Sequence, residues 1–144
     1  MKRLIVVVAL TFAAALAQAA PTSARWEPGN YELRVPDRYD FHTWIWMLAW
    51  CGDNCRDLQS VAQPVARAYA YTGQTHLVDG QWTFTTDVPD GLRCGNIYYG
   101  QTIPTHDVYT WDPNTLAGTL ASTFDAGCDG RPGTMTYPIW LVRM

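Results

Sequence analysis

The stretch that decides the fold is HLVDGQWTFTT, residues 76–86, in which two alternating segments flank an Asp-Gly pair. This pair readily adopts the positive φ angles of a type I′ turn, a common two-residue link between antiparallel strands. Pairing through the turn places Leu77 opposite Trp82 and puts Phe84 on the same face. We therefore expect a β-hairpin whose aromatic face belongs to the core.

Similar alternating segments, separated by Gly, Pro and Asp turns, lie on both sides of this hairpin at 31–35, 41–51, 57–61, 65–72, 103–111, 116–124 and 135–143. We expect Gly73 to end the strand at 65–72. We expect Pro138 to lie at an edge or a bulge, because proline donates no hydrogen bond to a ladder. About eight short strands predict an all-β domain, a single small antiparallel barrel or sandwich, and leave the choice between the two open.

The first residues have the pattern of an export signal. Lys2 and Arg3 precede an apolar run that ends in Ala-Gln-Ala at 17–19, and this run is too short to span a bilayer. We predict a cleaved signal helix at 1–19, a short leader at 20–28 and one secreted β-domain at 29–144. The mature chain is expected outside the cytoplasm, extracellular or associated with the cell envelope, without a membrane span.

Charge excludes one class of partner. Cleavage leaves eight of the ten basic residues, all arginine, against 13 acidic ones, which gives a net charge of −5. A protein that binds phosphate backbones needs a basic stripe, and scattered arginines among more acids do not supply one. We predict no nucleic-acid partner.

Four cysteines in an exported chain predict two disulfides, and three pairings are possible. We favour Cys51 with Cys55 and Cys94 with Cys128, because Gly-Asp-Asn between the first two has the chemistry of a tight turn. The C-x3-C spacing differs from the C-x-x-C of thiol oxidoreductases. The histidines do not pair with the cysteines at zinc-finger spacing, and we predict no metal site.

Catalytic motifs are missing from the sequence. The three histidines, His42, His76 and His106, adjoin no nucleophile motif, and there is no Gly-rich phosphate loop. His106 is followed by Asp107, but adjacent residues on a strand point to opposite faces.

The acidic residues also argue against catalysis. Glu27 and Glu32 are the only glutamates, most aspartates lie in turns, and the run Asp53, Asn54, Asp57 lacks the spaced acids of a calcium loop. We assign no catalytic residue and no cofactor.

Aromatic residues are the candidate ligand-binding set. Trp44, Trp46 and Trp50 share one face of the segment 41–51, and Tyr69 and Tyr71 share one face of 65–72. Flat rings of this kind line pockets for lipids or sugars, or form a patch for a protein partner. The alternative is that the rings are core, since tryptophan buries a large apolar area.

Several motifs carry a family resemblance: the Trp-rich segment that runs into CGDNC, LVDGQW, the Cys94 turn, YTWDPNTLAG and the closing WLVRM. With these the chain resembles small secreted, disulfide-containing actinobacterial proteins, mycobacterial ones above all, of unassigned function. It also resembles lipocalin and avidin-type barrels, in which Gly-x-Trp opens the first strand and a late arginine packs across it. Here Gly29-Asn30-Tyr31 and Arg143 take those places, with tyrosine instead of tryptophan. This second resemblance implies a closed barrel.

We therefore predict a secreted, non-enzymatic β-domain that binds a small apolar or glycan ligand, or a protein partner, outside the cytoplasm. A structural or interaction module of the cell envelope is the alternative. A hydrolase that uses a His/Asp pair is the third possibility. The sequence leaves the ligand, the partner and the oligomeric state open.

Overall fold

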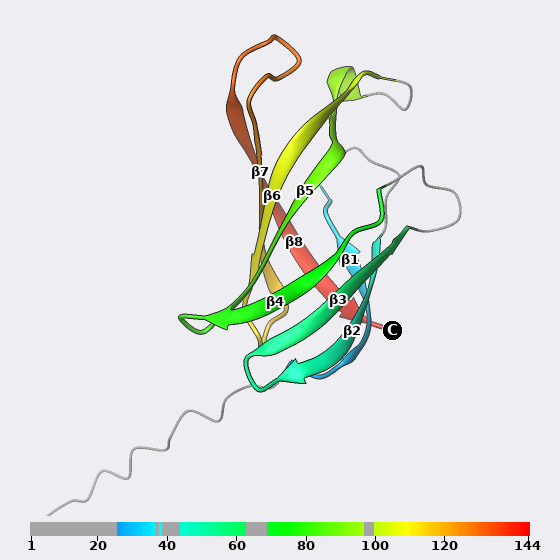
Figure 1. Ribbon diagram of the computed structural model, residues 1–144, viewed down its shortest axis with the longest axis vertical. Helices are drawn as coiled ribbons and strands as arrows, with labels where there is room; N and C mark the ends of the chain where they lie inside the picture. The colour runs from blue at the N-terminus through cyan, green and yellow to red at the C-terminus, as the bar shows by residue number, and fades with distance from the viewer. Residues whose placement is uncertain (1–25, 37, 39–43, 63–68, 97–99) are drawn as a thin grey trace, which may run out of the picture.

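The chain folds into a closed barrel of eight antiparallel strands, each paired with the next in sequence and the last with the first (Figure 1). The computed structural model describes residues 26–36, 38, 44–62, 69–96 and 100–144. The strands are β1 (Gly29–Arg34), β2 (Trp44–Gly52), β3 (Cys55–Ala62), β4 (Thr72–Val78), β5 (Gln81–Arg93), β6 (Thr102–Trp111), β7 (Ala117–Phe124) and β8 (Gly133–Arg143), with a 3-10 turn at Cys94–Asn96. The all-β prediction is confirmed, and the architecture is a barrel.

The predicted hairpin is confirmed as β4–β5. Asp79 and Gly80 have φ angles of 50° and 81°, and Leu77 pairs with Trp82. Trp82 and Phe84 are each 1% exposed, so their face is core. Beyond the third pair from the turn the two strands diverge, as Figure 1 shows.

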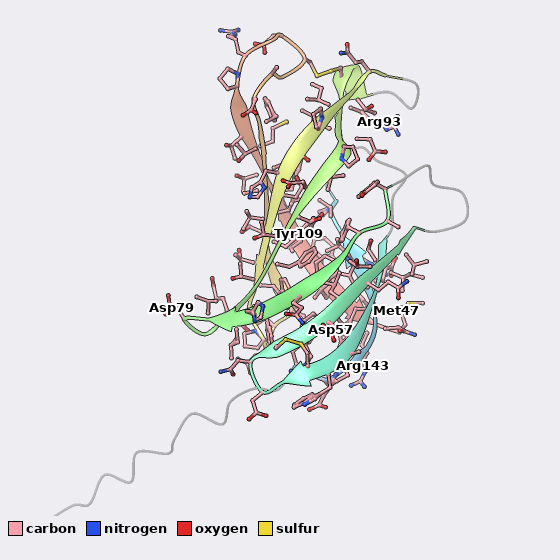
Figure 2. All side chains as sticks on the ribbon, in the orientation of Figure 1. Met47, Asp57, Asp79, Arg93, Tyr109 and Arg143 are labelled. Atoms are coloured by element: carbon pink, nitrogen blue, oxygen red, sulfur yellow. A yellow bond between two sulfur atoms is a disulfide. The ribbon has the colours of Figure 1, made fainter. Side chains whose placement is uncertain are left out.

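The two ends of the barrel differ. The closed end carries the β2–β3, β4–β5 and β6–β7 turns and is filled by buried rings. The mouth end lies at the opposite ends of the strands and carries the 3-10 turn at Cys94–Asn96 and the β7–β8 connection. In Figure 2 Asp79 marks the closed end, Arg93 lies toward the mouth and Tyr109 lies between them.

Trp26 belongs to the filling of the closed end, although it falls in the segment expected to be a leader. It is 2% exposed, and its ring centroid lies 4.8 Å from that of Trp111 and 5.4 Å from that of Trp82. The folded unit therefore includes Trp26. The predicted signal peptide at 1–19 lies outside the described residues.

The strand predicted at 65–72 is wrong in its bounds. β4 begins at Thr72, and Gly73 lies inside it instead of ending a strand. A Cβ at Gly73 would lie 2.8 Å from Cε2 of Phe84, so glycine makes room here for a core ring. Residues 63–68 lie outside the described part of the chain.

The prediction for Pro138 is confirmed. Pro138 pairs with Thr119 of β7, whereas the pairing of β8 with β1 begins only at Trp140. At Pro138, β8 thus has a described strand on one side only, where a missing N–H is tolerated.

Both favoured disulfides are present. Cys51–Cys55 closes the β2–β3 turn, and Cys94–Cys128 joins the β5–β6 connection to the β7–β8 connection at the mouth end. Within the described ranges, no helix is long and apolar enough to cross a bilayer.

Candidate functional site

Of the four candidate aromatic residues whose side chains the structure describes, two lie inside the barrel. Trp46 is fully buried and Tyr71 is 4% exposed. The indole N–H of Trp46 donates to the hydroxyl of Tyr71 at 2.9 Å, and both rings contact Phe84. These two rings form part of the core.

The other candidates lie apart from each other. Trp50 is 48% exposed at the closed end, where its ring covers the buried guanidinium of Arg56 at 4.1 Å. Tyr69 is 45% exposed and lines a pocket at the mouth end. The side chain of Trp44 lies outside the described part of the structure. The structure therefore does not bring the five residues into one surface, and of the described candidates only Tyr69 borders this pocket.

The pocket beside Tyr69 has a volume of about 630 Å³ and lies at the mouth-side ends of β5, β6 and β7. Strand alternation makes five of its lining residues outward-facing, namely Asp87, Pro89, Pro104, His106 and Thr123, and the exposed Asp125 follows the end of β7. Together these six residues combine two prolines with polar groups. The pocket thus offers a flat ring, apolar proline surfaces and two exposed carboxylates.

One side of this pocket is an exposed His–Asp pair. His106 and Asp87 are direct cross-strand partners, and Nδ1 of His106 lies 2.7 Å from a carboxylate oxygen of Asp87. Asp107 points into the barrel at 1% exposure, so it and His106 lie on opposite faces as expected. The two serines of the described chain, Ser60 and Ser122, are buried inside the barrel, away from this pair. The arrangement lacks a serine nucleophile.

A layer of polar side chains lies inside the barrel, on the mouth side of the aromatic residues that fill the closed end. The hydroxyl of Tyr109 donates to Oδ2 of Asp107 at 3.5 Å, and the hydroxyl of Tyr71 lies 3.4 Å from that of Tyr109. Arg38, which follows β1, reaches in and places Nη1 3.7 Å from the same carboxylate oxygen. The layer joins a buried ion pair to a chain of phenol hydroxyls.

Burial sets the protonation of these phenols. Desolvation raises the pKa of Tyr71 and that of Tyr109 well above the usual tyrosine value, and the nearby Asp107 carboxylate acts in the same direction. Desolvation also raises the pKa of Tyr31, against a smaller opposing effect of Arg143. The phenols of the layer stay neutral at physiological pH and can donate hydrogen bonds.

A second hollow crosses the outer face of β2, β3 and β4, where Figure 2 labels Met47 and Asp57. Its volume is about 480 Å³, and Gln74 on its wall donates to Asp57 at 2.9 Å. Met47 and the nearby Val61 are partly exposed, at 38% and 36%. This face is therefore more apolar than the mouth pocket.

Comparison with known proteins does not assign any of these features. No protein-family model, no curated protein and no solved structure matches the chain. Among the described residues, no group of three His, Cys, Asp or Glu side chains could hold a metal ion.

Sequence reasoning missed Arg38 and Asp87 as site residues, and it considered Asp107 only as a neighbour of His106. Asp107 had a usable signal, because it alternates in phase with the buried residues Tyr109 and Trp111 of β6. Asp87 pairs with His106 only through the register of β5 on β6, and Arg38 follows a strand without any periodic pattern. Neither could be placed before the strand pairing was known.

Proposed function

We propose that this protein is an exported, non-enzymatic binding domain that holds a glycan ligand in the mouth pocket. One observation carries the proposal: the pocket beside the exposed Tyr69 ring is also lined by the carboxylates Asp87 and Asp125. A ring supplies a flat apolar surface, and a few placed polar groups orient a ligand on it.

The lining suits a sugar better than a hydrocarbon. Tyr69 and the prolines can cover the C–H face of a sugar ring, while carboxylates accept hydrogen bonds from hydroxyl groups. A hydrogen bond with an ionised partner is stronger than a neutral one, which favours Asp87 and Asp125 as the orienting groups. His106, already held by Asp87, presents its second ring nitrogen as a further polar contact.

Export is part of the proposal. The two disulfides are compatible with an extracellular location, where such bonds persist. The signal-like residues 1–19 and the resemblance to secreted actinobacterial proteins point the same way. The likeness to lipocalin and avidin-type barrels is supported by Arg143, whose Nε would lie 3.8 Å from a Cβ built on Gly29.

The test is a chemical-shift titration of the oxidised mature domain with a panel of mono- and oligosaccharides. We expect at least one sugar to give saturable shifts that centre on Asp87, His106 and Thr123. Tyr69→Ala should abolish them, whereas the control Trp50→Ala, at a similarly exposed ring near the other end, should leave them unchanged. Loss in the control alone would move the site to the closed end, and no saturable shift with any sugar would refute a glycan ligand.

The outer face of β2–β4 supports a second function, an interaction module of the cell envelope. Met47 and Val61 expose apolar surface beside the 480 Å³ hollow, which is the character of a protein contact. Co-purification of one defined envelope protein, lost in Met47→Glu and kept in Tyr69→Ala, would favour this function over the first.

A further inference from the structure

The interior layer around Arg38 has the composition of a cage for a cation. The Arg38 side chain is 11% exposed and lies 3.7 Å from the buried carboxylate of Asp107. Its guanidinium carbon lies 5.9 Å from the centre of the Tyr137 ring, and Nη2 donates to the carbonyl of Gly91. An acid, an aromatic face and a carbonyl are the groups that bind guanidinium and ammonium ions.

This layer holds acceptor atoms that remain unpartnered while Arg38 is in place. Oδ1 of Asp107, Oγ1 of Thr105 and Oγ of Ser122 are buried and have no hydrogen-bond partner in the described structure. Asp107 and Ser122 are cross-strand partners, and Thr105 is two residues from Asp107 on the same face of β6. Buried polar atoms are nearly always hydrogen-bonded, so three at neighbouring positions call for a donor-rich occupant.

We propose that this layer is a binding site for a small organic cation with a guanidinium or primary ammonium group, and that Arg38 occupies it in the free protein. The unpartnered oxygens match the several N–H donors of such a group. Asp107 supplies the opposite charge, and Tyr109 keeps its proton and so adds no competing negative charge. The outward-facing side chains of the proposed glycan pocket lie on the other side of the barrel wall, and Thr105 borders both that pocket and this layer.

The experiment removes the Arg38 guanidinium from the layer and adds a small guanidinium salt that can bind in its place. Arg38→Ala deletes the guanidinium, and methylguanidinium chloride is then added while the melting temperature is followed, with sodium chloride at equal ionic strength as the reference. A ligand that binds only the folded state raises the melting temperature saturably. We expect the shift in melting temperature to be half-saturated at roughly 1–10 mM methylguanidinium, because a single small ion makes few contacts. The wild-type protein should respond at least about tenfold more weakly, because Arg38 competes for the site.

Matched variants decide the outcome. In Arg38→Ala with Asp107→Asn the saturable response should vanish, whereas in Arg38→Ala with Tyr69→Ala it should persist. If Arg38→Ala does not fold, Arg38→Met keeps the apolar stem and serves in its place. An equal response in wild type and variant, a response that survives Asp107→Asn, or no saturable response in a folded Arg38 variant would overturn the proposal.

Discussion

The buried phenols make the barrel sensitive to alkali, and the size of the effect follows from their environment. Tyr71 and Tyr109 are 4% and 1% exposed, and desolvation raises the pKa of each above the ordinary tyrosine value of 10.0. Above pH 10 the unfolded chain releases these protons and the folded chain keeps them. Proton release therefore lowers the free energy of the unfolded state relative to that of the folded state. Stability that is fully present below pH 10 is lost as the pH rises.

Each such phenol removes about 1.4 kcal/mol of stability per pH unit above 10. Two of them together remove about 5 kcal/mol between pH 10 and pH 12, which is comparable to the whole stability of a marginal domain. We expect cooperative unfolding in this interval. Tyr31, whose pKa is also raised by burial, adds to the loss.

The assay follows phenolate absorbance and near-ultraviolet circular dichroism in one titration. Tyr71 and Tyr109 should ionise together with the loss of tertiary signal. In Tyr71→Phe the alkaline slope should fall by about half relative to the two-phenol value. Ionisation of all tyrosines near pH 10 with the dichroism intact would refute the reasoning.

Two further predictions concern covalent and steric constraints. Replacing Cys94–Cys128 by serines should lower the free energy of unfolding by about 4 kcal/mol, and replacing Cys51–Cys55 should lower it by about 2 kcal/mol. The reason is that the first disulfide closes a loop of sequence separation 34 and the second a loop of 4. Urea unfolding of the two variants checks this order, and a reversed order contradicts the loop-entropy argument. Gly118→Ala should lower the free energy of unfolding by about 3 kcal/mol or more, because the added Cβ would lie 1.9 Å from a backbone carbonyl of β6. A melting temperature close to that of the wild type would contradict this and show that β7 can shift away.

Local chemistry explains why parts of the fold could be predicted. The type I′ turn depends on Asp79 and Gly80 alone, and the Cys51–Cys55 bridge on the three residues between its ends, so neither needs distant information. Strand alternation also placed Trp82 and Phe84 correctly on one buried face.

Alternation did not show which face of β2 points inward. Trp46 and Leu48 lie on one face, and Ile45 and Met47 on the other, so both faces are apolar in sequence. The structure buries the first pair and leaves Met47 38% exposed. That choice depends on closure of the barrel, which brings Tyr71 within hydrogen-bonding distance of Trp46.

The candidate sites were hidden for a related reason. The mouth pocket joins Tyr69, which precedes β4, to side chains of β5, β6 and β7, so its members become neighbours only in the paired sheet. From the sequence we interpreted Gly73 as the end of a strand, because the Phe84 ring that requires a glycine there comes from another strand. In each case the missing information was a contact between segments distant in sequence.

The junction between β8 and β1 gives the strand order the character of a ring. Tyr31 pairs with Arg143, and the amide of Met144 donates to the carbonyl of Asn30 at 3.0 Å, so the two ends of the barrel sequence lie side by side. Every strand neighbours the next one around the circle, and the break between the last and the first is topologically equivalent to any turn. A circular permutant joined there by a short linker and opened in the turn at 112–116 would keep all eight strand pairings and both disulfides.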